Sequence, residues 1–175
     1  MLAGCVAPPP SVSLPPIAQG ASSDPLEAAL YGAADAFAAP ARLRANPAAA
    51  AVAVAQLEYL AVEIPAGRYL RPLGSLVGPA LQSARYEMRR YLGIPQTAAP
   101  QAVIDALTAA VSLSSSGPAA AAAQLPASLF PEGGTEAWHR LADMPRLPQV
   151  NSATQMALRQ WLFGPPEQMI DVGDD

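Results

Sequence analysis

Apolar residues recur along much of the chain at the three- and four-residue spacing of an amphipathic helix. The clearest case is the apolar stripe of Val77, Leu81, Ala84, Met88 and Leu92. No segment sustains an alternation of apolar and polar residues, and β-branched residues are few, so the pattern indicates no strand. The sequence therefore predicts an all-α protein, a compact bundle of about five to six short to medium alanine-rich helices.

Proline placed after a capping residue marks where helices are expected to begin. Asp24-Pro25 and Asn46-Pro47 each put a side-chain acceptor before a proline in the first helical turn. Pro65 and Gly93 are expected to end helices, because proline lacks an N–H and glycine adopts the left-handed conformation. The expected helices cover residues 25–39, 47–64, 75–92 and 100–113, a short segment from 118, a segment capped by Thr135, and one capped by Asn151 that ends at Phe163.

The chain divides into three parts by composition. Residues 6–22 hold five prolines and no charge, which favours an extended, semi-rigid tether. We therefore expect residues 1–22 to form a disordered N-terminal segment and residues 23–164 to form a single helical domain. The acidic residues 165–175 are expected to be a flexible tail.

Charge and cysteine content exclude several classes of protein. Charged residues make up 14% of the 175 residues, the net charge is −4, and lysine is absent. A nucleic-acid partner is not expected, because phosphate binding requires clustered positive charge. The single cysteine excludes a disulfide within the chain. We also expect no metal site, since Cys5 and His139 are far apart and a structural zinc needs about four ligands.

The sole cysteine stands in a short motif near the start of the sequence. Leu2-Ala3-Gly4-Cys5 resembles the lipobox of bacterial lipoproteins, and the proline-rich segment follows it directly. The resemblance implies that Cys5 is acylated and anchors the protein to a membrane. Val6 is not the aspartate associated with retention at the inner membrane, so the resemblance implies the periplasmic face of the outer membrane. The cytoplasm is the alternative location. No stretch of 18 or more apolar residues predicts a membrane span.

Tyrosine and arginine gather in the second and third expected helices and their connection. Residues 58–91 hold four of the five tyrosines and five of the ten arginines, together with three glutamates, giving a local charge of +2 in an acidic chain. Arginine and tyrosine are enriched at the centres of protein interfaces. The candidate residues for binding a partner or an anion are Tyr59, Tyr69, Tyr86, Tyr91, Arg68, Arg71, Arg85, Arg89 and Arg90.

A structural interpretation of the same arginines competes with the functional one. Arg85 and Arg89 lie four residues apart on one helix face, where like charges repel. Glu58 or Glu63, on the neighbouring antiparallel helix, could compensate by pairing with them. The sequence leaves open whether these arginines form buried ion pairs or a surface site, and it favours the ion pairs.

The last expected helix ends in Trp161-Leu162-Phe163, three large apolar residues in a row. Such a run cannot lie entirely on one helix face. A buried helix end is the favoured interpretation, and a contact surface is the alternative.

Catalytic patterns are sparse. His139 follows Trp138 without a nearby nucleophile, and the sequence contains no Gly-x-Ser-x-Gly motif or glycine-rich phosphate loop. No Cys-x-x-Cys-His motif supports haem attachment. We therefore expect that the protein is not an enzyme and binds no cofactor.

Two functional hypotheses follow. The first is a lipid-anchored periplasmic protein that serves as an accessory or scaffold subunit of an envelope assembly, with an envelope protein as its partner. The second is a helical carrier whose arginines hold the head of a lipid-like or acidic small ligand. A pocket larger than ~300 Å³ beside Arg85 or Arg89 would favour the carrier.

Overall fold

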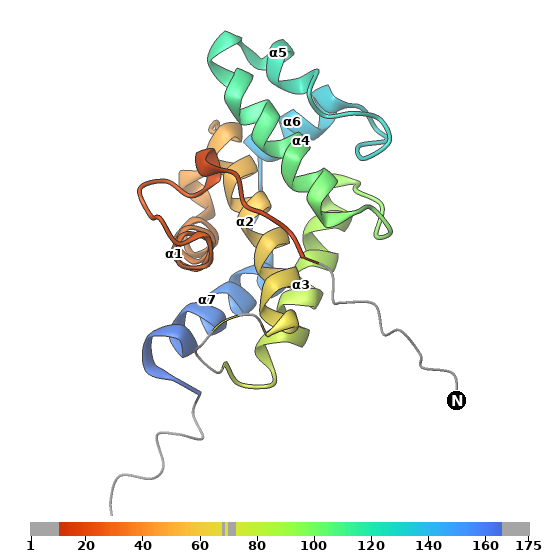
Figure 1. The fold of residues 1–175 in the computed structure, drawn as a ribbon. Coiled ribbons are helices and arrows are strands. Elements are labelled where there is room, and N and C mark those ends of the chain that lie inside the picture. The colour runs from red at the N-terminus through yellow and green to blue at the C-terminus, as the bar shows by residue number, and fades with distance from the viewer. Residues whose placement is uncertain (1–10, 68, 70–72, 166–175) are drawn as a thin grey trace, which may run out of the picture.

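The computed structural model describes residues 11–67, 69 and 73–165, and in this part the chain forms helices joined by loops and turns (Figure 1). It contains seven α-helices and three short 3₁₀ helices, which confirms the predicted all-α class with slightly more helices than expected. The α-helices are α1 (Pro25–Ala38), α2 (Pro47–Ala66), α3 (Val77–Leu92), α4 (Pro100–Leu113), α5 (Pro118–Ala122), α6 (Gly134–Ala142) and α7 (Pro148–Phe163). The 3₁₀ helices are Pro16–Ala18, Pro40–Arg42 and Ser114–Ser116.

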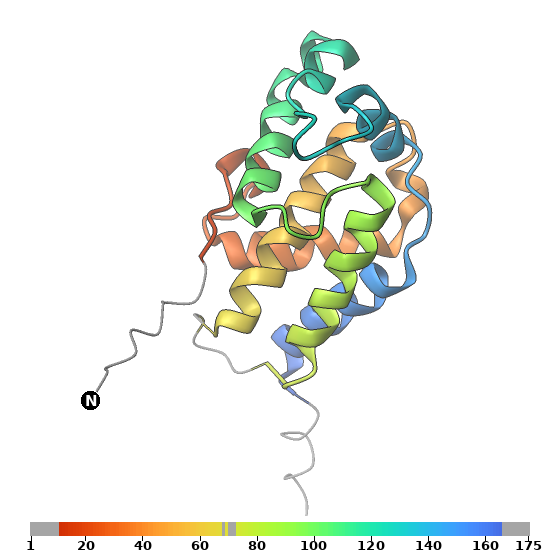
Figure 2. The same cartoon turned by 90° about the vertical axis from the view of Figure 1, so that its right-hand side faces the viewer.

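Helix α2 is the centre of the bundle. It packs against α1, α3, α4 and α6, while α7 packs across α3 and α1 (Figures 1 and 2). α2 is 20 residues long and has the hydropathy of a membrane-spanning helix, but 78% of its most apolar window is buried within the domain. Burial on nearly all sides is what an all-round apolar helix requires in a folded domain. We therefore interpret α2 as the core helix of the domain.

The two predicted proline caps are confirmed. The Asp24 carboxylate accepts hydrogen bonds from the amides of Leu26 at 2.8 Å and Glu27 at 3.3 Å. The Asn46 side chain accepts one from the Ala49 amide at 3.1 Å. These contacts satisfy N–H groups that have no partner within the helix.

The predicted end of the second helix at Ile64 is wrong by two residues. Pro65 lies inside the last turn of α2, and the helix ends at Ala66, before a left-handed Gly67. Proline in this position cannot donate to the carbonyl of Ala61, four residues earlier. The side-chain amide of Gln82, on α3, donates to that carbonyl instead. A neighbouring helix thus supplies the missing donor.

The predicted caps Thr135 and Asn151 lie inside helices, because α6 begins at Gly134 and α7 at Pro148. No local side chain caps α7. Instead, the Glu87 carboxylate on α3 accepts a hydrogen bond from the Val150 amide at 3.0 Å. The Asn151 side chain donates to the carbonyl of Phe37 at 2.7 Å, so it joins α7 to α1.

Residues 11–22 were expected to belong to a disordered tether, but the structure shows that they pack on the domain. Leu14 and Ala18 are buried in the hydrophobic core, and a 3₁₀ helix forms at Pro16–Ala18. The Gln56 side chain on α2 donates to the Ala18 carbonyl at 2.8 Å. Gly32 makes room for this contact, since a Cβ at that position would lie 2.4 Å from the Gln56 amide group. The described part of the expected tether is therefore part of the folded domain.

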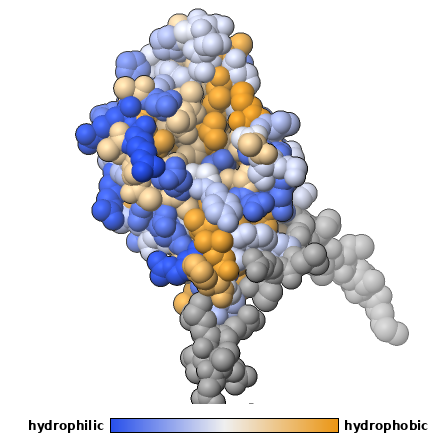
Figure 3. Space-filling model, turned by 90° about the vertical axis from the view of Figure 1, so that its left-hand side faces the viewer, coloured by the Kyte–Doolittle hydropathy of each residue, from blue (hydrophilic) through white to orange (hydrophobic). Residues whose placement is uncertain are grey.

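At the end of α7, Trp161 packs partly buried against the core, but the next two large apolar residues are exposed, contrary to the favoured expectation. Phe163 is 65% exposed and Leu162 is 41% exposed, whereas Trp138 on α6 is buried. Other exposed large apolar residues belong to different elements, such as Ile17 and Leu76. Figure 3 shows one face of the molecule, on which hydrophobic residues gather in separate areas bordered by hydrophilic ones.

Candidate docking surface

A buried ion pair joins the two central helices of the candidate region. Arg89 on α3 and Glu58 on α2 are each 1% exposed at their side chains. The Arg89 Nε and Nη2 atoms donate to the two carboxylate oxygens of Glu58, both at 2.7 Å. The bidentate geometry confirms the sequence-based pairing of Arg89 with Glu58.

Arg89 also fixes the loop that follows α3. Its Nη1 donates to the carbonyl oxygens of Gln96 at 3.0 Å and Ala98 at 2.9 Å, with a longer contact of 3.3 Å to Pro95. A buried guanidinium is tolerated only when its donors are satisfied in this way. The Arg89 side chain is therefore a structural element of the domain.

Burial corrects the docking interpretation for two of the candidate residues. Arg89 is fully enclosed, and Tyr59 is buried in the hydrophobic cluster around α2. Neither side chain is accessible to a partner in this fold. The apolar stripe predicted for α3, from Val77 to Leu92, is buried at all five positions. It faces the same core as Arg89.

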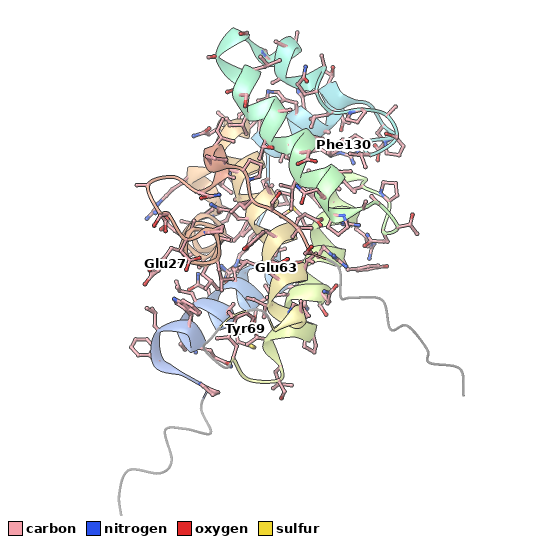
Figure 4. The ribbon with its side chains drawn as sticks, in the orientation of Figure 1. Glu27, Glu63, Tyr69 and Phe130 are labelled. Atoms are coloured by element: carbon pink, nitrogen blue, oxygen red, sulfur yellow. The ribbon has the colours of Figure 1, made fainter. Side chains whose placement is uncertain are left out.

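Two further tyrosines hold the domain together through their hydroxyl groups. Tyr69, beyond the end of α2 (Figure 4), donates to the carbonyl of Ile64 at 2.8 Å. The single hydroxyl proton of Tyr91, on α3, is shared between the carbonyls of Arg140 at 2.8 Å and Asp143 at 3.0 Å, at the end of α6. Burial raises the pKa of both phenols above the ordinary value, at which a phenol is already a protonated donor near neutral pH.

Arg85 lies between the buried and exposed sides of α3. It is partly exposed, and its Nη2 donates to the Gln82 side-chain oxygen at 2.7 Å. It forms no salt bridge within residues 11–67, 69 and 73–165, although Glu58 interacts with it electrostatically at longer range. Within these ranges, a direct ion pair with a carboxylate is therefore found for Arg89 and not for Arg85. Desolvation lowers the pKa of the Arg85 guanidinium, but an arginine remains charged near neutral pH.

The exposed side of α3 carries a tyrosine and an arginine one turn apart. Tyr86 is 53% exposed, and the guanidinium carbon of Arg90 lies 5.9 Å from the centre of its ring, within the range of a cation–π contact. Arg90 has no salt bridge to any carboxylate in the part of the chain that the structure describes. This pair leaves both a ring face and a cation available at the surface.

Tyr86 and Arg90 belong to an open groove of about 760 Å³ between α3 and the start of α7, which we call the α3 groove. Four of its residues were not expected from the sequence. The sequence could have indicated them, because these polar positions lie away from the predicted apolar stripe on α3 or at the start of the last helix. The groove is lined by Gln82, Ser83, Tyr86, Glu87, Arg90, Tyr91 and Gln149.

A second depression, of about 310 Å³, lies on the other side of α3 and contains Arg85. We call it the Arg85 depression. Most of its lining is aliphatic, and Gln82 borders both it and the α3 groove. Its residues are Ala61, Val62, Pro65, Ala66, Gln82, Arg85 and Pro100.

Three of the predicted site residues, Cys5, Arg68 and Arg71, lie outside the described residues. Within the described ranges, no three His, Cys, Asp or Glu side chains gather where they could hold a metal ion. His139 is exposed on α6.

Comparison with known proteins adds no relative to this picture. No family model, curated protein or solved structure matches the chain.

Proposed function

We propose that the protein is a non-enzymatic, lipid-anchored periplasmic subunit that serves as an accessory or scaffold component of an envelope assembly. The α3 groove is its docking surface for a protein partner. The exposed Tyr86–Arg90 pair is the observation that supports this most directly, because tyrosine and arginine with accessible side chains are the residue types that contribute most to binding at interfaces.

The lipid anchor is proposed from the sequence motif at Cys5. Leu2-Ala3-Gly4-Cys5 resembles a lipobox, and Val6 favours the outer membrane. Attachment by lipid would place the domain at the membrane without a spanning helix. A single acyl chain binds a membrane weakly and reversibly, whereas two chains give stable anchoring.

The intact mass of the protein from its native host tests the anchor. We expect a chain that begins at Cys5 and carries the added mass of acyl groups, recovered with the outer membrane. A Cys5→Ala variant is the control and should remain unacylated. An unmodified chain in the soluble fraction would overturn the proposed anchor and would favour the cytoplasmic alternative.

Cross-linking from the α3 groove tests the partner. With p-benzoylphenylalanine at position 86, illumination of cells should give one adduct with an envelope protein, identified by mass spectrometry. The same probe at Tyr31, an exposed tyrosine on α1, is the matched control and should give none. Arg90→Ala should lower the adduct yield by about tenfold, as expected for an arginine important for binding.

The lower adduct yield of Arg90→Ala should not result from unfolding of the variant. Arg90 is exposed and has no salt bridge among the described residues, so Arg90→Ala should leave the midpoint of thermal unfolding nearly unchanged. Equal adduct yields from positions 86 and 31, or no effect of Arg90→Ala, would contradict the proposal that this groove binds a partner.

The Arg85 depression supports a second candidate function, a carrier for an acidic or lipid-like ligand. Its volume is at the lower limit of small-molecule sites, its walls are largely aliphatic, and one arginine stands beside them. A lipid that copurifies in fixed ratio with the unacylated Cys5→Ala variant would favour this candidate over the scaffold.

A further inference from the structure

Residues 12–14 are fixed to helices α2 and α4 by hydrogen bonds and by a buried leucine, and we call this set of contacts the clamp. The Val12 amide donates to the Glu63 carboxylate at 2.9 Å. The Ser13 amide donates to the Gln101 side-chain oxygen at 2.7 Å, and the Gln101 side-chain nitrogen donates back to the Ser13 carbonyl at 3.2 Å. Leu14 follows directly and is buried. We call the part of the surface around Glu63 and Gln101 the attachment edge (Glu63 is labelled in Figure 4).

Because the clamp holds residues 12–14 on the domain, only the residues between Cys5 and Ser11 can act as a tether for a lipid on Cys5. Six residue steps separate Cys5 from Ser11, and a chain spans at most about 3.3–3.6 Å per residue. The greatest distance between the Cys5 and Ser11 backbones is therefore about 20 Å. With residues 12–14 fixed on the domain, a lipid on Cys5 can reach only the surroundings of the attachment edge.

The Arg85 depression lies next to that edge. Val62 and Pro100 line the depression, and their sequence neighbours Glu63 and Gln101 form the clamp. Arg85 is the basic residue of the lining and has no salt bridge among the residues that the structure describes. A guanidinium without a salt bridge can bind a phosphate group through several N–H donors.

We propose that the attachment edge, with Arg85 beside it, is the side of the domain that rests against the phosphate layer of the membrane. This inference depends on the proposed lipid anchor at Cys5. The same inference identifies the side of the domain that faces away from the membrane. Helix α4 runs from the attachment edge for about 20 Å, at 1.5 Å per residue, toward α5 (Figures 1 and 2). Helix α5 therefore points away from the membrane.

The single thiol allows this orientation to be tested without the native acylation machinery. The full chain is coupled through Cys5 to a maleimide-bearing lipid in vesicles of phosphatidylcholine and phosphatidylglycerol. A photo-crosslinking residue is placed either at Ala66, in the Arg85 depression, or at Ala119, on α5. We expect several-fold more lipid adducts from position 66 than from position 119. Equal yields would overturn the proposal.

A longer tether provides the matched control. Insertion of about twenty Gly and Ser residues between Val6 and Ala7 gives a flexible link that extends by about 25 Å on average. It should remove the difference between positions 66 and 119 while leaving the coupling intact. A difference that persists would show that the clamp and the short tether do not orient the domain.

Arg85→Gln tests the role of the guanidinium. We expect it to reduce the adducts from position 66 severalfold in vesicles that contain phosphatidylglycerol, with unchanged helical content by circular dichroism. An unchanged yield would exclude Arg85 from the contact. Because the coupling is chemical, a native protein without acyl groups would contradict the proposed anchor alone, whereas equal adducts would contradict the orientation alone.

Discussion

Replacement of Arg89 by methionine should lower the free energy of unfolding by about 3–5 kcal/mol, measured by urea denaturation. The variant leaves the Glu58 carboxylate buried at 1% exposure without its bidentate partner. Desolvation of an unpaired charge is the dominant cost. The carbonyls of Gln96 and Ala98 also lose their donor, so the backbone amides of residue 94 and residues 96–99 should exchange faster with solvent.

Two matched variants separate the causes of this loss. Arg90→Met changes the adjacent, exposed arginine and should alter stability by less than about 0.5 kcal/mol. The double variant Glu58→Leu with Arg89→Met should recover much of the stability, because it removes both buried charges. A cost for Arg89→Met no greater than that for Arg90→Met would show that the pair is not a structural element.

Gly134→Ala should be the second strongly destabilising change, with an expected loss of about 3 kcal/mol. Gly134 is the first residue of α6, where the helix passes close to the end of α5. A Cβ there would lie 2.1 Å from the Ala122 carbonyl oxygen and 2.7 Å from that of Leu125. Both obstacles are backbone atoms, so the clash is relieved only if α5 and α6 separate.

Gly78→Ala on α3 is the control for this glycine. Its added Cβ would meet the Pro65 ring at 3.5 Å, an ordinary van der Waals contact. Alanine is the better helix former, and the substitution should raise stability by about 0.5–1 kcal/mol. Thermal unfolding of the two variants side by side gives the comparison. A Gly134→Ala variant as stable as Gly78→Ala would contradict the close packing of α5 and α6.

The sequence predicts those parts of the fold that depend on neighbouring residues. Asp24 and Asn46 lie within a few residues of the amides that they cap, so their role is visible in the local sequence. The apolar stripe of α3 is equally local, because helical geometry alone brings its positions onto one face.

The remaining helix ends depend on partners far along the chain. Pro65 is accommodated in α2 because Gln82 supplies a donor. Pro148 in the first position of α7 was a local signal for its start, but the acceptor for the Val150 amide comes from Glu87, 63 residues away. No pattern in the immediate sequence contains these partners. Buried Leu14 and Ala18 were also missed, since their proline-rich surroundings resemble a tether until the surfaces of α2 and α4 are known.

The candidate site was predicted as a region but not residue by residue. Charge balance correctly indicated that Arg89 needs a carboxylate, and the structure identifies it as Glu58. The sequence did not separate Arg89 from Arg90, although the two adjacent residues lie on different sides of α3. Their position relative to Leu81 and Met88 could have done so, because residue 89 is next to the apolar stripe and residue 90 is turned away from it.

The contacts between α1 and α7 also set the order in which the chain can fold. The carbonyl of Phe37 accepts from Asn151, 114 residues later, and that of Ala34 accepts from Gln155. At 5–20 residues per second, synthesis of the intervening 114 residues takes about 6–23 s. During that interval the side of α1 that packs on α7 has no partner. For those seconds its apolar residues remain exposed, a condition that favours aggregation of a chain before it is complete.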